Sequence, residues 1–355
     1  GKYCVKILTL FLFFSCLGIG FHLAQRNALE NDEIFSQYSI QRLTYAEILQ
    51  GKIPEGNNFP LFYVSQKLLF DFTRFRLDPN WHAKQDICNP DAQMWMRLLP
   101  VMCASIAITL IFYFFACHYN IWAGVLALAL ALTSPMVWIY WAQARPYGLW
   151  LLISVCQLLL LIKGRQSMII HFLLCLTTPF GVAQTVIAAL ILRKRYLWPM
   201  AAPAVIGLLY YVQAPRYLFR VPHPAFELIT GNFPLERIIL LLICAVWIIY
   251  HWRNTKNHAA AVLLAYSLAS FVVPIFIIAY YMVQNVQGNA GFELSARYFI
   301  FLTPLSTIVT MLVWVKVWNG HASNIWMRLH LAQGIAGVLA LGAIHTWVAA
   351  QRLLV

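Results

Sequence analysis

Long runs of apolar residues, separated by short polar segments, make up most of this 355-residue chain. A helix needs about 20 mostly apolar residues to cross the hydrocarbon core of a bilayer. The runs predict nine membrane-spanning helices: 7–24, 98–117, 121–142, 146–162, 197–213, 237–252, 259–283, 297–317 and 329–349. The pattern therefore predicts an all-α polytopic membrane protein, with residues 1–355 forming a single transmembrane domain.

The apolar stretch 168–192 differs from these runs because Thr177-Thr178-Pro179-Phe180-Gly181 interrupts it with strong helix breakers. Basic residues flank the stretch at 163–165 and at 193–195, and short basic loops are typical of the cytoplasmic face. A single crossing would put the two clusters on opposite faces, so we predict a broken, re-entrant helix pair and 11 helical segments in all. Irregular backbone at membrane depth must be buried in protein or line a wet cavity, and we expect a polar cavity near residues 177–181.

Charge is distributed unevenly along the chain. Nine of the 12 acidic residues fall between Glu30 and Asp91, and the others are Glu227, Glu236 and Glu293. The predicted cytoplasmic loops contain basic residues and no acid, so positive-inside loops, rather than nucleic-acid binding, explain the net charge of +13. The N-terminus is then cytoplasmic, and the loops 25–97, 214–236 and 284–296 lie on the outer face.

Composition fits this class of protein. Hydrophobic residues are 61% of the chain, charged residues 10%, and the mean hydropathy is +0.70, whereas soluble domains are about a quarter charged. Eight cysteines without C-x-x-C spacing and ten dispersed histidines predict no metal site and no disulfide framework.

Lys2 and Lys6 precede apolar residues as in a signal sequence, but no cleavage site follows, so we expect an uncleaved first membrane helix. Gly1 in place of Met suggests a processed or tagged start.

Two sequence signals in the first outer loop, 25–97, predict helices that lie in the membrane interface. Thr44 and Glu47 have the spacing of a helix capping box. Pro60 is a favourable first residue for a helix that places Leu61, Val64, Leu68, Phe72 and Phe75 three or four residues apart. This second helix either lies flat in the membrane interface with its apolar side down or packs on the outer ends of the spans.

Polar chemistry collects at the outer ends of the predicted spans. No Asp, Glu, Lys or Arg lies in mid-span, which argues against an ion-coupled transporter. The outer ends instead carry the adjacent acids Asp32 and Glu33, and the arginines Arg97, Arg145 and Arg297. Guanidinium groups match phosphate, so this set suits a lipid-phosphate substrate. Interfacial anchoring of the arginines and a simple helix cap at the acids are the alternatives.

The order of these motifs resembles the GT-C superfamily, and within it the dolichyl-phosphate-mannose–protein mannosyltransferases and lipid A aminoarabinose transferases. The motifs are Asn31-Asp32-Glu33 after the first span, Asn58-Phe59-Pro60-Leu61-Phe62-Tyr63, Arg97-Leu98-Leu99-Pro100, Ser134-Pro135 with Gln143-Ala144-Arg145-Pro146-Tyr147, and Arg297-Tyr298-Phe299 with Pro304. The resemblance covers most of residues 7–165 and is weak from there to about residue 290.

The resemblance implies a GT-C-like bundle and an inverting glycosyltransferase. Its donor would be a polyprenyl-phosphate-linked sugar, and its acceptor a hydroxyl of a lipid, glycan or protein. Asp32 would be the general base, and Glu33 would orient the acceptor or raise the basicity of Asp32. The donor phosphate would bind Arg97, Arg145 and Arg297. No cofactor is required, although a divalent cation at Asp32 and Glu33 stays open.

Sugar or acceptor contacts are expected from Asn58, Tyr63 and Tyr147, with Trp138 and Trp141 as further aromatic candidates. An interfacial aromatic belt explains the aromatic residues equally well. The sequence departs from the family pattern at Asn58, where relatives often carry His or Lys. It also lacks an acid between Gln143 and Ala144, and no large C-terminal soluble domain follows.

Two other functions also agree with the sequence. One is a non-catalytic membrane subunit that keeps the GT-C fold within a larger complex, and the other is a lipid or solute transporter. The short loops favour the inner membrane of a bacterium, with the active face in the periplasm.

Overall fold

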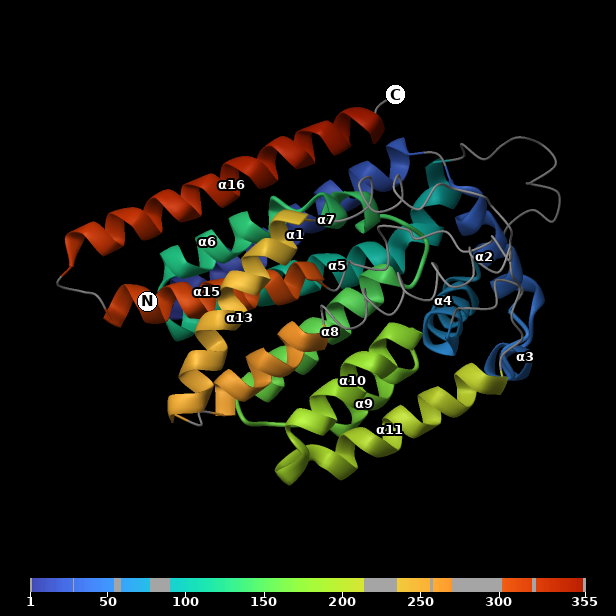
Figure 1. Cartoon of the computed structure of the whole chain (residues 1–355). Coiled ribbons are helices and arrows are strands. Elements are labelled where there is room, and N and C mark those ends of the chain that lie inside the picture. Colours follow the sequence, from blue (N-terminus) through green and yellow to red (C-terminus); the bar gives the residue numbers. More distant parts are fainter. Residues whose placement is uncertain are drawn as a thin grey trace, which may run out of the picture.

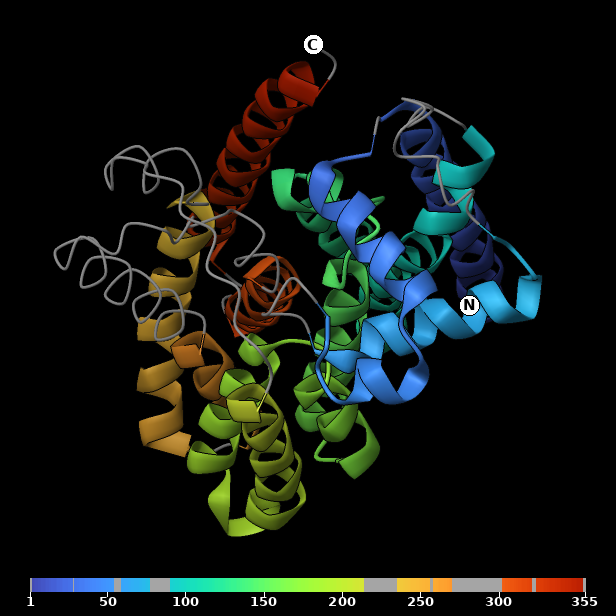
Figure 2. The same ribbon diagram turned by 90° about the vertical axis from the view of Figure 1, so that its right-hand side faces the viewer.

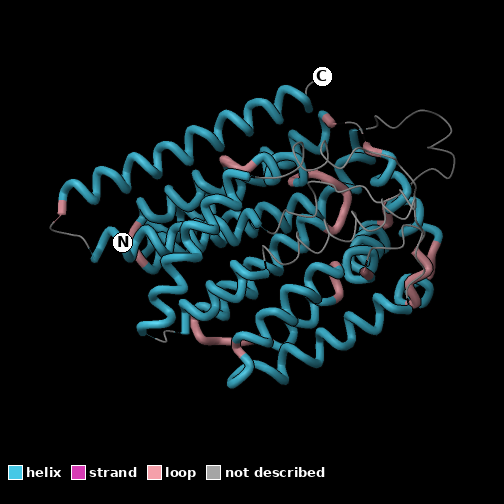
Figure 3. Tube along the Cα trace, in the orientation of Figure 1, coloured by secondary structure: helices cyan, strands magenta, loops and turns pink. Residues whose placement is uncertain are grey.

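The structure, a computed structural model, describes residues 2–27, 29–53, 59–76, 90–213, 235–255, 258–269, 302–320 and 324–353. Every regular element in these ranges is a helix (Figure 3). The helices are α1 (Lys2–Arg26), α2 (Asn31–Arg42), α3 (Tyr45–Leu49), α4 (Pro60–Thr73), α5 (Pro90–His118), α6 (Ile121–Leu132), α7 (Pro135–Tyr140), α8 (Tyr147–Ile162), α9 (Met168–Cys175), α10 (Pro179–Ile191), α11 (Arg193–Gln213), α13 (Leu235–Thr255), α15 (Leu302–Gly320) and α16 (Ile325–Leu353), together with a helix at His258–Ala269.

Three of the described helices are long and apolar enough to cross a membrane: Tyr3–Arg26, Gln93–His118 and Ile325–Val348. Shorter apolar helices of 10–17 residues accompany them, including Ile121–Leu132 and Tyr147–Ile162. The predicted all-helical class is therefore confirmed, while the prediction of nine full spans goes beyond what the helix lengths show.

One predicted span, 121–142, is two helices. α6 ends at Leu132 and α7 begins at Pro135, with Ser134 in an extended conformation between them. Proline lacks a backbone N–H and disfavours helical geometry in the residue before it, so the Ser134-Pro135 step ends α6. Hydropathy alone does not detect the break between α6 and α7, because apolar residues continue on both sides of it.

The predicted break in 168–192 is present, between α9 and α10. Thr178 caps α10 by accepting a hydrogen bond from the Gly181 backbone N–H at 3.0 Å, and Pro179 occupies the first helical position. A Cβ at Gly181 would lie 2.2 Å from the Leu174 carbonyl oxygen, so only glycine allows this close turn. Thr177 and Thr178 are buried, and the Leu61 N–H donates to the Leu176 carbonyl at 3.1 Å. The turn is thus packed inside protein, one of the two settings in which irregular backbone is tolerated at membrane depth, and the expected polar cavity stays a prediction.

Many of the charged residues that the structure describes lie near the two ends of the bundle. Helices α2, α3 and α4 lie at one end, on the right of Figure 1, with the C-terminal end of α1. These elements carry Glu30, Asp32, Glu33, Glu47 and Asp71 among basic residues such as Arg42, Lys67 and Arg76, and we call this the acidic end because most acids of the described ranges lie here. The connections from α8 to α9 and from α15 to α16 lie at the opposite end, on the left of Figure 1. Lys163 and Arg165 lie between α8 and α9, and Lys316 and Arg328 lie near the junction of α15 and α16.

Helices α2 and α4 lie across the acidic end, at a steep angle to the bundle helices (Figure 2). The predicted capping box is present at the start of α3, where Thr44 accepts from the Glu47 N–H and Glu47 accepts from the Thr44 N–H. The predicted helix start at Pro60 is also confirmed. Phe62, Gln66 and Phe70 on α4 are buried, whereas Leu68 and Phe72 are 56% and 88% exposed. The apolar stripe seen in the sequence is therefore divided: Leu68 and Phe72 face outward, whereas Leu61, Val64 and Phe75 pack against the protein core. Both predicted settings of this helix, in the membrane interface and against the ends of the spans, agree with this arrangement.

Exposed apolar side chains cover the outer helices. Phe11 and Phe14 of α1 are 70% and 61% exposed, and Ile243 and Val246 of α13 are 65% and 70% exposed. On α16, Trp326 and Trp347 are 70% and 66% exposed. Continuous apolar surfaces of this kind are unfavourable in water and are typical of helices that face lipid.

Tyr45 of α3 and Asp71 of α4 form a hydrogen bond that shifts the pKa values of both groups. The Tyr45 hydroxyl donates to Asp71 Oδ2 at 2.6 Å, and this bond, with help from Lys67 and Arg76, lowers the pKa of Asp71. Burial and the same carboxylate raise the pKa of Tyr45 to about 12. Because the Asp71 pKa is lower in the folded state, its contribution to stability is present above the unfolded pKa and is lost as pH falls through the folded pKa.

We predict that Tyr45→Phe moves the Asp71 pKa upward, toward the ordinary aspartate value. The chain has five aspartates, so ¹³C-labelled Asp signals followed by NMR against pH measure this directly. Tyr3→Phe, at a residue that is 83% exposed, is the matched control and leaves Asp71 unchanged. An Asp71 pKa identical in wild type and Tyr45→Phe contradicts the assigned cause.

Candidate active site

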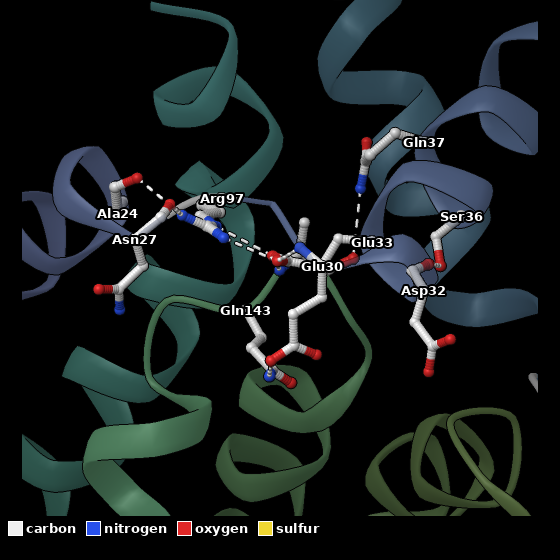
Figure 4. A network of polar contacts seen from close by, with 10 residues as sticks. Ala24, Asn27, Glu30, Asp32, Glu33, Ser36, Gln37, Arg97 and Gln143 are labelled. Carbon is white, nitrogen blue, oxygen red and sulfur yellow. Dashed lines mark hydrogen bonds and ion pairs between the residues drawn. The ribbon is translucent and has the colours of Figure 1, made fainter. Parts of the chain in front are cut away.

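Helix α2 carries the adjacent acids of the sequence, and its helical twist sends their side chains to different places. Asp32 and Glu33 lie in its first turn, with Glu30 as the N-cap residue. Successive residues of a helix are rotated by about 100°, so neighbours do not share a face. Figure 4 shows Glu33 directed toward Arg97 and Asp32 directed away from that pair.

Glu33 and Arg97 form a buried, bidentate ion pair. Arg97 Nε lies 2.9 Å from Glu33 Oε1, and Nη2 lies 2.7 Å from Oε2. The Arg97 side chain is 2% exposed and that of Glu33 is fully buried. Arg97 Nη1 also donates to the carbonyl oxygens of Ala24 and Asn27 at 2.8 and 2.6 Å, at the end of α1. The pair therefore ties together α1, α2 and α5.

The segment between α7 and α8 is held against α2 through the peptide groups of Ala144. The Ala144 N–H donates to Glu33 Oε1 at 2.6 Å, and the Gln37 side-chain amide donates to the Ala144 carbonyl at 3.3 Å. The Gln143 side chain donates to Glu30 Oε1 at 3.0 Å. These contacts join residues more than 100 positions apart and fix the entry to α8 beside the first turn of α2.

Asp32 lies beside Arg145, which the same segment carries. Arg145 Nη2 is 3.8 Å from Asp32 Oδ2, and Nη1 donates to the Asp32 carbonyl at 3.2 Å and to Ser36 Oγ at 2.7 Å. The Arg145 side chain is 8% exposed, whereas Asp32 is 45% exposed. The structure thus places one accessible carboxylate next to one buried guanidinium, at the acidic end of the bundle.

The aromatic residues that the sequence singled out are packed within the protein. Tyr63 and Tyr147 are buried in apolar clusters, and Tyr147 packs edge-on against Tyr140 at 5.2 Å between ring centroids. Trp141 is also buried, and its Nε1 donates to Ser105 Oγ at 3.2 Å. Trp138 Nε1 donates to the Leu132 carbonyl at 2.6 Å. Asn58 and Arg297 lie outside the described residues.

The Asp32-Glu33 pair does not fit a shared divalent cation. Glu33 is buried and both its oxygens bind Arg97, while the Asp32 carboxylate points to the other side (Figure 4). Across the described ranges, His, Cys, Asp and Glu side chains form no group of three or more suited to a metal ion.

Sequence reasoning had singled out Asp32, Glu33 and Arg145 but missed their neighbours Glu30, Ser36 and Gln37. Glu30, Glu33 and Gln37 recur at helical spacing on one side of α2, and all three bind the segment at Gln143-Ala144. Asp32 and Ser36, four residues apart, both contact Arg145. This helical spacing of polar residues just after an apolar span was the available signal.

In the part of the chain that the structure describes, the fold is all-helical, three helices are long and apolar enough to cross a membrane, and a polar cluster lies at one end of the bundle. Comparison of the sequence with protein-family models and with curated proteins finds no match.

Proposed function

We propose that this protein is a membrane glycosyltransferase that moves a sugar from a polyprenyl-phosphate carrier to a hydroxyl acceptor with inversion. The observation that carries the proposal is the half-exposed carboxylate of Asp32, held beside Arg145 at the end of an apolar bundle. A carboxylate in this position suits a general base for an acceptor hydroxyl, and the bilayer interface is where a lipid-linked sugar presents its phosphate.

The geometry favours different roles for Asp32 and Glu33. Asp32 is the accessible member and takes the catalytic role. Glu33 is buried against Arg97, so we assign this pair a positioning role: it holds α2 on α1 and α5 and thereby fixes the direction of Asp32. A direct phosphate contact from Arg97 does not fit a guanidinium that is buried and already binds one carboxylate and two carbonyl groups.

We assign Arg145 to the acceptor side because it lies beside Asp32. In an inverting transfer the base and the leaving group lie on opposite faces of the sugar carbon. A guanidinium 3.8 Å from the base therefore orients Asp32 and the acceptor, and the leaving phosphate needs another cation. Arg297 remains the sequence candidate for that role.

A test of the donor class uses the purified chain in vesicles. With a mixture of hydroxyl acceptors present, methyl β-D-glucopyranoside and N-acetylserinamide, we expect it to transfer the sugar and release free undecaprenyl phosphate from at least one undecaprenyl-phosphate sugar in a panel carrying glucose, galactose, mannose or 4-amino-arabinose. Arg297→Ala is expected to raise the KM for that donor, with Arg253→Ala, at an arginine of the opposite end, as the control. No release from any member of the panel overturns the proposal. An unchanged donor KM in Arg297→Ala removes that arginine from phosphate binding.

A transporter is the second candidate, and one observation favours it. Gln157 of α8 lies within hydrogen-bond distance of His171 of α9, at 2.8 Å, and donates to Thr185 of α10 at 3.3 Å. Tyr266 also donates to Gln157. All four side chains are buried, and His171 Nε2 has no hydrogen-bond partner in the part of the chain that the structure describes. Buried polar residues inside apolar helices often mark a transport path, although they also strengthen helix packing.

A further inference from the structure

Two acid–arginine pairs lie at the first turn of α2, and they differ in how closely their charges meet. Glu33 and Arg97 are joined by two hydrogen bonds of 2.9 and 2.7 Å. Asp32 Oδ2 and Arg145 Nη2 are 3.8 Å apart, which is longer than a hydrogen bond. Both arginines are buried, so burial of the guanidinium does not explain the difference.

Ser36 binds the Arg145 guanidinium and explains why this pair is the looser one. Its Oγ accepts a hydrogen bond from Arg145 Nη1 at 2.7 Å, and it donates its own proton to the Asp32 carbonyl at 2.9 Å. Figure 4 shows Ser36 beside Asp32, one helical turn further along α2. The Ser36 side chain is fully buried, which strengthens its hydrogen bond to the guanidinium. Arg145 is thus held by a neutral hydroxyl next to the Asp32 carboxylate.

The other charged groups on α2, and on the elements that pack against it, interact with further residues. They are Glu30 with Gln143, Glu33 with Arg97, Arg42 with the Tyr38 ring, Lys67 with the Ile40 carbonyl, and Asp71 with Arg76. Among the described residues, Arg145 is the cation that forms an ion pair with Asp32. The distance between these two groups therefore affects how readily Asp32 takes up a proton.

A general base must present an oxygen to the acceptor hydroxyl and must be basic enough to take its proton. A bidentate arginine, as at Glu33, stabilises the charged carboxylate and engages both of its oxygens. We propose that Ser36 is a positioning residue, which holds the Arg145 guanidinium away from a bidentate contact with Asp32 and so keeps Asp32 an effective base.

This inference rests on the proposed transferase function and adds how the base of that site is kept reactive. In the reaction, the acceptor proton passes to Asp32 as the acceptor oxygen bonds to the anomeric carbon of the donor sugar. The bond from that carbon to the phosphate oxygen breaks, and the polyprenyl phosphate leaves with the electron pair. Ser36 makes or breaks no covalent bond, so it acts through the position of Arg145.

The test compares Ser36→Ala with a matched control, Ser39→Ala, in vesicles that contain the full chain. Ser39 is a buried serine of the same helix, and its hydroxyl donates to the Phe35 carbonyl at 2.8 Å. Both changes remove a bond from a serine hydroxyl to the carbonyl four residues earlier. Ser36→Ala also removes the acceptor of Arg145 Nη1, so it allows the guanidinium to close on Asp32.

In Ser36→Ala we expect kcat for transfer to fall about fivefold or more, with the donor KM within about twofold of wild type. The acidic limb of the pH profile of kcat moves to lower pH, because a closer cation favours the carboxylate. Ser39→Ala keeps kcat within about twofold and leaves the limb in place. Ser36→Thr keeps the hydroxyl and is expected to restore the wild-type pH profile.

A second measurement does not depend on activity. The ¹³C signal of the Asp32 carboxyl, followed by NMR, is expected to titrate about half a pH unit or more lower in Ser36→Ala than in wild type. Titration at a higher pH means that Ser36 holds Arg145 toward Asp32, and it overturns the proposal. The same titration in Ser36→Ala, Ser39→Ala and wild type also overturns it. A wild-type protein that transfers no sugar instead contradicts the transferase function, while the NMR comparison still tests the role of Ser36.

Discussion

Asp32→Asn is expected to lower sugar transfer at least about a hundredfold, because a positioned carboxylate base contributes on the order of 10²–10⁴-fold to such a reaction. The amide keeps the size of the carboxylate but does not accept the acceptor proton. Arg145 still has its bonds to the Asp32 carbonyl and to Ser36, so the site keeps its local structure. Initial rates of transfer at saturating donor measure the effect.

Asp71→Asn is the matched control for this substitution. Asp71 is also an exposed aspartate of the acidic end, 40% exposed, and it pairs with Arg76 at 3.3 Å. We expect its transfer rate to stay within about twofold of wild type, since it lies on α4 and not in the Asp32–Arg145 contact. Equal turnover in wild type and Asp32→Asn would remove Asp32 from the mechanism.

The largest effect on stability is expected from the Glu33–Arg97 pair. Removal of one partner leaves a buried charge without its counter-ion, which costs about 3–5 kcal/mol. Arg97→Met is the clearest case, because it leaves the buried Glu33 carboxylate and the carbonyls of Ala24 and Asn27 without their donor. Reversible unfolding in mixed micelles, followed by helical circular dichroism, gives the change in free energy.

A double-mutant cycle identifies the interaction. Glu33→Leu with Arg97→Met removes both charges, so we expect it to be less destabilising than the sum of the single changes. It does not fully recover wild-type stability, because the N–H groups of Glu30 and Ala144 lose their acceptor. An Arg97→Met variant within about 1 kcal/mol of wild type would contradict a positioning role for the pair.

Local signals made several helix boundaries predictable. The capping box at Thr44 and Glu47 and the proline at position 60 both mark helix starts that the structure contains. The Pro179–Gly181 break is also present, because proline and glycine act through the local backbone. Ser134-Pro135 is the same kind of signal, but hydropathy averaged over the longer run concealed it.

Helix α2 and the pairing of its acids were not predictable in this way. The segment from Asn31 to Arg42 has little apolar periodicity, and it is held by contacts with Arg97 and with residues 143–145. Such contacts join positions 64 to 113 residues apart, and no local pattern encodes them. The sequence placed two acids and several arginines on one face of the membrane. Only the helical rotation between Asp32 and Glu33 decides which acid is buried and which is accessible.

The most direct measurement follows a radiolabelled sugar in vesicles that contain the protein, an undecaprenyl-phosphate donor and a mixture of sugar and serine hydroxyl acceptors. We predict that wild-type protein makes a covalent product in which the label is on an acceptor, with inverted anomeric configuration, and that Asp32→Asn makes almost none. Label that stays on its lipid carrier and only moves across the bilayer, equally in wild type and Asp32→Asn, would contradict a transferase with Asp32 as its base.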